Sequence, residues 1–588
     1  MDRGTGDAAI ALTLLWGSLK LRPYLNLFTQ EISVTSLARF ANSGVLSDEL
    51  AAYGAFPQLE ILRPYLTAPL YGDPAAVPQL VDSPEGKILL ERLGRLILTR
   101  DRHNGHAALR QGLITAAAQG ELNLIQVFRQ FPDAKIRVHG PELGRIAWSI
   151  GRGLQQKQAA IARLEREFRR EQSAQSPTFR SLTSLVQPGS AIAWSTWLVE
   201  DPDRGRQIWV DVYQPEQQPQ TPAPVVVISH GLTANRRTFL YLARYLASHG
   251  FLVVALEHPD SNGAAHQDFL AGKTATLLPP EALIERPRDV SFVLDVLTQA
   301  GLDRWFDLQQ VGIVGHSLGG NTALALAGAQ LDRQQLAQAC PQTSTSLNLS
   351  LVFAQCPMLN LPTRKTQQNL RDPRIVSVVA INPVASQVFS AASLADLEVP
   401  LLVVASEQDW ITPALEEQIL PFQHLQSQAS RPEPRPPRYL ALLRGAQHWT
   451  AMGGQDCLRP GPRLSGPAQP SWEPMILGRR VARTGSALAD EAVRQAQQLQ
   501  RTETRAIARD YLCGLSTAFF ETTLKAQPLQ RYLSADYAAT LSQPQLPLVF
   551  VQSQPRDRTG TTRIGTTRIG TTRSLDTPRA AKRGWGRG

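Results

Sequence analysis

A serine flanked by glycines is the residue of this sequence best suited to do chemistry. It is Ser317, in the Gly-His-Ser-Leu-Gly run at 315–319. The β-branched stretch 311–314 precedes this run and a helix-forming stretch follows it. A serine on such a tight strand-to-helix turn presents its hydroxyl, because the small neighbours leave room for adjacent backbone. The pattern predicts a nucleophile elbow.

A serine hydroxyl becomes nucleophilic when a base takes its proton, and that base needs an acid to hold its orientation. In folds with this turn the groups follow the chain order Ser, Asp or Glu, His. Asp409 comes just after the apolar stretch 401–405, and His448 just after the apolar stretch 439–443. Because buried parallel strands place their carboxyl ends at one edge of a sheet, we predict a Ser317, Asp409 and His448 triad there.

Two other carboxylates compete with Asp409 for the acid position. Glu407 is the nearer rival in sequence. Asp396 precedes its strand and is expected at the opposite edge of the sheet. Placement after the strand therefore favours Asp409.

Three other histidines compete with His448 as the base: His230, His258 and His316. We expect His230 to order its own loop and His258 to have a structural role. His448 follows the last predicted strand, as the base does in this chain order.

Attack on an acyl group leaves negative charge on its oxygen, which preorganised backbone amides can stabilise. The apolar stretch 225–229 ends in His230-Gly231-Leu232, where glycine permits a close turn. We predict that the amides of Leu232 and Leu318 form the oxyanion hole.

The elements that must position these residues alternate between strand and helix from residue 192 onward. Uniformly apolar strands are typical of a parallel sheet buried on both faces, so we predict an α/β-hydrolase fold with about eight mostly parallel strands over 191–552. The predicted strands are 194–199, 207–213, 225–229, 252–256, 311–314, 375–381, 401–405 and 439–443. The predicted helices are 237–249, 289–300 and 319–330, and the predicted inserts lie near 259–288, 331–374 and 455–503.

A small all-helical domain is predicted before this fold, over residues 31–140. Its apolar residues recur at helical spacing in 35–40, 47–53, 59–66, 84–98 and 107–119. Residues 141–190 are predicted as a connecting helix and linker, with an apolar helix face made of Leu154, Ile161, Leu164 and Phe168.

The 588 residues favour two or three domains, and the net charge of +10 is concentrated at one end. Residues 556–588 hold nine Lys or Arg against two Asp, so the rest of the chain has little basic excess and no nucleic-acid partner is expected. The repetitive basic tail 553–588 has too few apolar residues to form a core and is predicted to be disordered. No metal or cofactor motif is present, and none is expected.

Localisation is left open by the sequence. No apolar run is long enough for a membrane-spanning helix. Residues 1–30 contain an apolar stretch, 8–19, whose flanks fit a signal peptide poorly, so a degenerate export signal and an ordinary helix both remain open. Cys340 and Cys356 bracket a polar insert; an exported chain is expected to pair them, and two buried free thiols are the alternative.

The motifs Ser-His-Gly-Leu at 229–232, Gly-His-Ser-Leu-Gly at 315–319 and Glu-His-Pro-Asp-Ser at 257–261 resemble the platelet-activating-factor-acetylhydrolase-like branch of α/β-hydrolases, which overlaps with dienelactone-hydrolase-like enzymes. The helical stretch 31–132 resembles the N-terminal domain of unknown function found ahead of such hydrolases, largely in cyanobacteria. The resemblance implies a serine ester hydrolase, often exported.

One departure from that family concerns the acid. In the acetylhydrolase the acid follows the strand after the nucleophile helix, whereas here Ile381 is followed by Asn382 and Pro383. The acid must then come from the next strand, which favours Asp409. The departure also puts phospholipid specificity in doubt.

The function expected is hydrolysis of carboxylic esters, esterase- or lipase-like, through an acyl-serine intermediate, on a small-molecule ester or lipid. Lyase, thioesterase and peptidase versions of the same site remain open. A different class also remains open, an interaction protein that uses the helical domain and keeps the hydrolase fold as a scaffold. Oligomeric state and natural substrate are not indicated.

Overall fold

The computed structural model of the protein describes residues 29–51, 63, 66–67, 74–99, 101–131, 135–173, 179, 191–341, 348–427, 435–454, 457 and 487–553. The apolar stretch 8–19, for which an export signal and an ordinary helix were both left open, lies outside the described residues, as does the basic tail from residue 554 on. So do most of the linker, the middle of the 455–503 insert and most of the helix expected at 59–66.

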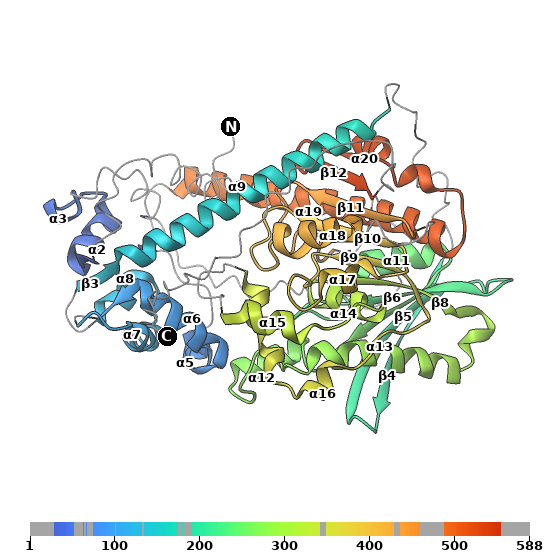
Figure 1. Ribbon diagram of the computed structural model, residues 1–588, viewed down its shortest axis with the longest axis horizontal. Coiled ribbons are helices and arrows are strands. Elements are labelled where there is room, and N and C mark those ends of the chain that lie inside the picture. Colours follow the sequence, from blue (N-terminus) through green and yellow to red (C-terminus); the bar gives the residue numbers. More distant parts are fainter. Residues whose placement is uncertain are drawn as a thin grey trace, which may run out of the picture. The chain divides into compact units, whose positions relative to one another are not determined.

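A nine-stranded sheet forms the centre of the larger part of the described chain (Figure 1). Its order is β12-β11-β10-β9-β8-β6-β7-β5-β4. The six strands from β11 to β7 in that order are mutually parallel. β12 pairs antiparallel with β11 at one edge; at the other, β5 pairs antiparallel with β7, and β4 pairs antiparallel with β5. The strands are β4 (Ile192–Asp201), β5 (Arg206–Pro215), β6 (Ala223–Ser229), β7 (Leu252–Glu257), β8 (Phe306–His316), β9 (Ile375–Ile381), β10 (Leu401–Ser406), β11 (Arg438–Leu443) and β12 (Leu548–Gln552).

The α/β-hydrolase prediction is confirmed, and all eight predicted strands are present. The ninth, β12, was not predicted. Helices cover both faces of the sheet: α11 (Leu240–Ser248) and α19 (Ala487–Leu524) on one, α13 (Ala282–Gln299), α14 (Leu318–Leu326) and α18 (Leu420–Ser427) on the other. The central strands are mostly apolar because their buried side chains, whichever face they point to, enter one of these two cores.

The strand register brings the predicted site residues to one edge of the sheet. Ser229 at the end of β6 pairs with Gly315 of β8, and Ser406 at the end of β10 pairs with Leu443 of β11. Since all four strands are parallel, the loops that follow them leave from the same edge.

The N-terminal part is mainly helical, as predicted, but it also contains a small antiparallel sheet of order β1-β3-β2. Both pairings join segments far apart in the sequence, and the strands are short, so the pattern of apolar residues does not reveal them. The strands are β1 (Thr29–Ser33), β2 (Ile97–Leu98) and β3 (Lys135–His139). The α-helices are α2 (Val34–Ser43), α3 (Asp48–Ala51), α5 (Val77–Asp82), α6 (Pro84–Leu96), α7 (His106–Ala118) and α8 (Leu124–Arg129).

A 32-residue helix, α9 (Gly140–Glu171), follows β3. Ile161 and Leu164, from its predicted apolar face, are 3% exposed and belong to the core of the large sheet. Lys157 donates from Nζ to the Glu407 carbonyl at 3.2 Å. Helix α9 therefore packs apolar side chains against the sheet, and its Lys157 side chain makes a hydrogen bond at the sheet edge where β10 ends.

Two of the predicted inserts contain short helices. The insert near 259–288 holds α12 (Gly263–Leu270) and the start of α13, and the insert near 331–374 holds α15 (Arg333–Ala339) and α16 (Thr363–Thr366). Cys340 and Cys356 form a disulfide with Cα atoms 5.8 Å apart, the alternative expected for an exported chain. A second disulfide, which was not predicted, joins Cys457 and Cys513. Of the helices in the described ranges, none combines the length and apolarity that crossing a membrane requires.

Candidate active site

Ser317 occupies the single-residue turn between β8 and α14. Its φ of 54° and ψ of −115° are strained for a residue with a side chain. A Cβ atom on Gly315 would clash with the Gly319 carbonyl, and one on Gly319 would clash with the Ser229 carbonyl. The Ser317 amide donates to the Ile381 carbonyl at 2.8 Å. The two glycines and this hydrogen bond to β9 allow the turn to keep its strained geometry.

Asp409 and His448 lie in contact at the ends of β10 and β11. Asp409 Oδ2 is 2.6 Å from His448 Nδ1, and the two residues are 5% and 7% exposed. Asp409 Oδ1 accepts from the amides of Ile411 and Thr412, both at 2.9 Å. The Thr412 hydroxyl donates to Oδ2 at 2.7 Å. The carboxylate is thus fixed by three donors while it holds one ring nitrogen of the histidine.

The rival carboxylates have other partners or positions. Glu407 Oε2 accepts from Arg444 Nε at 2.8 Å and from the Gly445 amide at 3.0 Å. Asp396 ends the short helix α17 (Ala391–Ala395), before β10 begins. Of the three candidate acids, Asp409 is the one that the structure brings to His448.

A rival candidate for the base, His316, and a residue not predicted for the site, Asn382, hold the backbone of His448. The His448 carbonyl accepts from His316 Nε2 at 3.0 Å and from Asn382 Nδ2 at 3.2 Å. Burial, and then the neighbouring His448, lowers the pKa of His316 to about 3, so His316 is neutral. Asn382 stands where the family's acid was expected, and its amide group also contacts Ser406. The signal that could have identified Asn382 was its position directly after β9.

The predicted oxyanion loop packs against the serine. A Cβ atom on Gly231 would lie 3.2 Å from Ser317 Cβ and 2.8 Å from His316 Nδ1. Leu232 follows this glycine, and Leu318 follows the serine as the first residue of α14. Amides at a helix start have no acceptor within the helix. Both predicted donors therefore belong to segments that border Ser317.

Comparison with known proteins gives two family matches. Residues 20–139 match the family described as alpha/beta hydrolase of unknown function (DUF1400), and residues 207–288 match platelet-activating factor acetylhydrolase, isoform II. The chain has an α/β-hydrolase fold, and these two matched segments resemble the platelet-activating-factor-acetylhydrolase-like branch of that fold. The N-terminal match coincides with the helical part described above.

Two kinds of curated relative are similar to parts of this chain. Platelet-activating factor acetylhydrolase of Cavia porcellus is 32% identical over 134 residues, which cover 17% of this chain and 31% of the relative. Cutinase est1 of Thermobifida alba is 32% identical over 128 residues, which cover 21% of this chain and 36% of the relative. The chain spans about a third of the length of the relatives it matches.

The other two candidate bases of the hydrolase are held away from the serine by buried partners. His258 lies between Ser229 Oγ and Asp289 Oδ2, each 3.0 Å from a ring nitrogen. His230 contacts the Gly231 carbonyl at 2.7 Å through Nδ1. Burial is the first cause that lowers the pKa of both histidines well below the usual value. The buried contacts of His230 and His258 are those of histidines with structural roles, which is what we expected for both.

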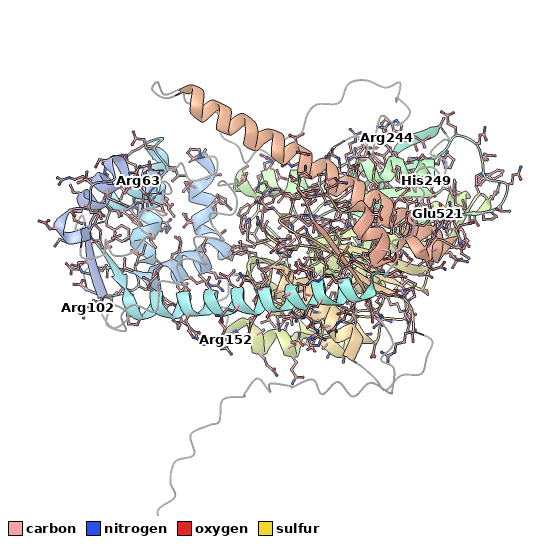
Figure 2. All side chains as sticks on the ribbon, turned by 90° about the horizontal axis from the view of Figure 1, so that it is seen from above. Arg63, Arg102, Arg152, Arg244, His249 and Glu521 are labelled. Carbon is pink, nitrogen blue, oxygen red and sulfur yellow. A yellow bond between two sulfur atoms is a disulfide. The ribbon has the colours of Figure 1, made fainter. Side chains whose placement is uncertain are left out.

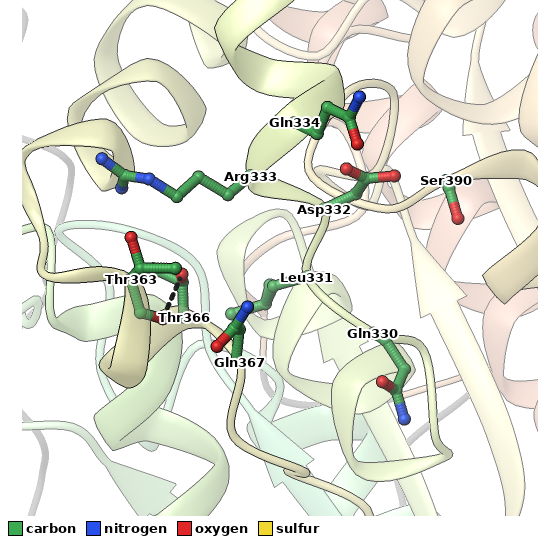
Figure 3. A pocket seen from close by; sticks show the side chains of 9 residues that line it. All are labelled: Gln330, Leu331, Asp332, Arg333, Gln334, Thr363, Thr366, Gln367 and Ser390. Atoms are coloured by element: carbon green, nitrogen blue, oxygen red, sulfur yellow. Dashed lines mark hydrogen bonds between the residues drawn. The ribbon is translucent and has the colours of Figure 1, made fainter.

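A cavity of about 280 Å³ lies at the far end of α14, around the start of α15 and α16 (Figure 3). Its lining is mostly polar and includes Asp332, Arg333 and Thr363. The Arg333 guanidinium is already bonded to the carbonyls of Met358, Leu359 and Leu361. None of the predicted site residues lines this cavity. In the described part of the chain, no cluster of His, Cys, Asp and Glu is arranged to hold a metal ion.

Proposed function

We propose that this hydrolase cleaves carboxylic esters through an acyl-enzyme intermediate on Ser317. The observation that carries the proposal is the 2.6 Å contact between Asp409 Oδ2 and His448 Nδ1, and the strained strand-to-helix turn that holds Ser317 supports it. Asp409 accepts from Nδ1 and thereby leaves Nε2 as the base. The partial likeness to an acetylhydrolase and a cutinase supports the same reaction class.

In the first half of the reaction, Ser317 Oγ attacks the ester carbonyl carbon and its proton passes to His448 Nε2. The carbonyl oxygen becomes an oxyanion, which accepts from the amides of Leu232 and Leu318. The tetrahedral intermediate then expels the alcohol, which takes the proton from His448, and the acyl group stays on the serine.

The second half repeats these steps with water. His448 takes a proton from the water, the hydroxide attacks the acyl carbon, and the acid leaves as Ser317 recovers its proton from His448. Asp409 stays ionised throughout and stabilises the imidazolium that forms twice. The natural substrate that we propose is a small-molecule ester or lipid.

Turnover of p-nitrophenyl acetate by wild-type protein and by Ser317→Ala tests this proposal. The variant should lose several orders of magnitude in kcat, because only substrate binding and the oxyanion donors remain. Unchanged circular dichroism shows that the variant is folded. Equal turnover by the two proteins would refute the assignment.

A further inference from the structure

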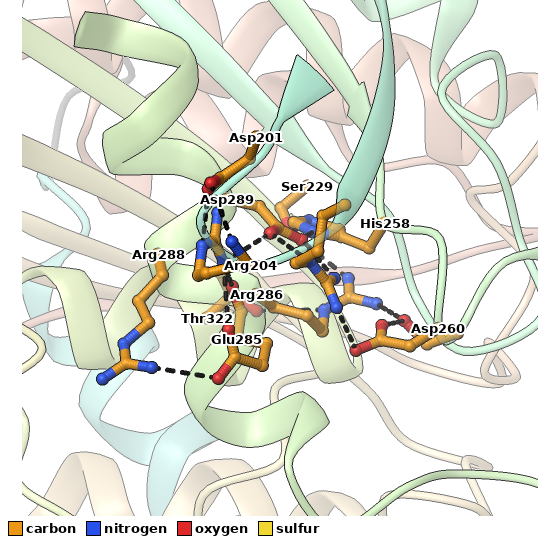
Figure 4. A network of polar contacts seen from close by, with 12 residues as sticks. Asp201, Arg204, Ser229, His258, Asp260, Glu285, Arg286, Arg288, Asp289 and Thr322 are labelled. Carbon is orange, nitrogen blue, oxygen red and sulfur yellow. Dashed lines mark hydrogen bonds and ion pairs between the residues drawn. The ribbon is translucent and has the colours of Figure 1, made fainter. Parts of the chain in front are cut away.

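A fully buried arginine, Arg286 of α13, links the segments around the proposed oxyanion hole (Figure 4). Its Nη1 donates to Ser261 Oγ at 2.7 Å, and its Nε donates to Thr322 Oγ1 at 3.2 Å. Its Nη2 donates to the His230 carbonyl and to Ser229 Oγ, the latter at 3.3 Å. One guanidinium therefore joins the end of β6, the loop after β7 and the nucleophile helix α14.

The Arg286 guanidinium donates to four oxygens, all of them neutral. Among the described residues, no carboxylate is hydrogen-bonded to it. The nearby carboxylates are bound by another arginine: Arg206 donates to Asp289 Oδ2 at 2.7 Å and to Asp260 Oδ2 at 3.1 Å. Burial lowers the pKa of Arg286 to about 10, so it remains a cation at neutral pH. Burying a cation without a bonded anion costs free energy, which makes its position informative.

A chain of hydrogen bonds leads from this cluster to the Leu232 amide. His230 Nε2 accepts from the His258 amide at 3.0 Å, so the ring proton of neutral His230 is on Nδ1. That nitrogen donates to the Gly231 carbonyl at 2.7 Å. The Gly231 carbonyl and the Leu232 N–H belong to one peptide group, so this hydrogen bond fixes the direction of the N–H and polarises it.

Leu318, whose amide is the second proposed donor, is linked to the same guanidinium through its carbonyl. Thr322 Oγ1 accepts from Arg286 and donates to the Leu318 carbonyl at 3.1 Å. Leu318 and Thr322 lie one turn apart in α14. Arg286 thus contacts the chain on both sides of the place where an ester oxygen would become negative.

We propose that Arg286 is a positioning residue for the oxyanion hole: it locks the His230–Leu232 loop to the nucleophile helix and places a positive charge behind the two donor amides. The inference rests on the proposed function. Arg286 does not touch the substrate; it acts through the amides of Leu232 and Leu318. Its contribution is therefore expected in the transition state more than in substrate binding.

The experiment compares Arg286→Met and Arg286→Lys with wild-type protein, using p-nitrophenyl acetate and phenylboronic acid, which forms a tetrahedral adduct with an activated serine. Active sites are first counted with a fluorophosphonate, so that unfolded protein does not enter the constants. Arg286→Met should lower kcat per site about a hundredfold with KM changed less than about threefold, and should weaken phenylboronic acid binding in parallel. Arg286→Lys should recover part of both losses because it restores the charge.

Arg438 offers a matched control. It is also buried, and it donates to the carbonyls of Leu425 at 2.7 Å and Leu397 at 2.6 Å, but at the start of β11, the opposite end of the strand from His448. Arg438→Met should lower stability and leave kcat per site unchanged. If Arg286→Met does not fold, Thr322→Val removes one contact of Arg286 and should lower kcat several-fold.

A folded Arg286→Met variant with wild-type kcat and boronate affinity would overturn the inference. An equal loss of kcat per site in Arg438→Met would also overturn the inference, because it would indicate a general effect of removing a buried arginine. Failure of the proposed function has a separate signature, because Ser317→Ala would then retain the activity of the wild-type protein.

Discussion

Thr412 donates its hydroxyl to Asp409 Oδ2 at 2.7 Å, three residues after that carboxylate in the same loop. The same oxygen is bonded to His448, so the threonine and the histidine share one acceptor. The hydroxyl also lies 3.2 Å from His448 Nδ1. Thr412 thereby sets the position at which the acid meets the base.

This contact predicts the behaviour of Thr412 variants. Thr412→Val keeps the shape but removes the hydroxyl, and kcat should fall about tenfold because one hydrogen bond to an ionised group is lost. Thr412→Ser should retain most of the activity. Steady-state kinetics on p-nitrophenyl acetate measures both, and equal kinetics for the Val and Ser variants would exclude the role.

The identity of the acid can be tested by neutralising each candidate. Asp409→Asn should lower kcat on the order of 10⁴-fold, because the amide no longer holds the productive tautomer of His448. Glu407→Gln and Asp396→Asn should each change kcat less than about threefold. Comparable losses in all three variants would show that the loss reflects folding and not the acid position.

A buried histidine away from the site predicts how stability depends on pH. His249, at the end of α11, has no hydrogen-bond partner for either ring nitrogen among the described residues. Lys525 Nζ donates to the His249 carbonyl at 2.6 Å and to Glu521 Oε1 at 3.0 Å; Figure 2 labels His249 and Glu521. Burial, and then Lys525, lowers the pKa of His249 from 6.5 to about 4.

The sign of this effect follows from proton binding. Between pH 6.5 and 4 the unfolded chain binds a proton at His249 that the folded chain does not, so the free energy of unfolding falls as the pH falls through this window. The loss should reach about 3 kcal/mol and level off at lower pH. Urea unfolding at pH 7.5 and 4.5 should show a smaller pH dependence for His249→Phe than for wild-type protein. The same pH dependence of the free energy of unfolding in His249→Phe and wild-type protein would contradict the lowered pKa of His249.

The disulfides predict the thiol content of the protein. Cys340–Cys356 and Cys457–Cys513 close loops with sequence separations of 16 and 56 residues. In the chain-entropy model these loops contribute about 3 and about 4 kcal/mol to stability. Protein matured in an oxidising compartment should show no free thiol in denaturant without reductant and four after reduction. Four free thiols before reduction would exclude both bridges.

Most of the sheet could be predicted because its central strands are buried on both faces and are therefore mostly apolar. Asp409 and His448 could be proposed because each directly follows such a strand. β12 was missed because it follows the long 455–503 insert and joins the sheet antiparallel at its edge.

The roles of Arg286 and Thr412 could not be predicted, and for Asn382 the sequence offers its position after β9 but not its contact with the His448 carbonyl. Each role depends on partners that the fold brings together from different segments. In the sequence, a buried arginine cannot be told from an exposed charged residue of a helix. The small N-terminal sheet was not predicted for a similar reason: Glu31 and Arg137, which pair in it, lie 106 positions apart in the sequence.

Covalent capture of the serine tests the central claim most directly. Native protein is incubated with a fluorophosphonate, digested and analysed by mass spectrometry, beside Ser317→Ala and heat-denatured protein. The proposed mechanism predicts one adduct per chain, on the peptide that contains Ser317, and none in either control, because only a serine activated by His448 reacts. Absence of an adduct from native, folded protein, or an adduct that persists in Ser317→Ala, would contradict it.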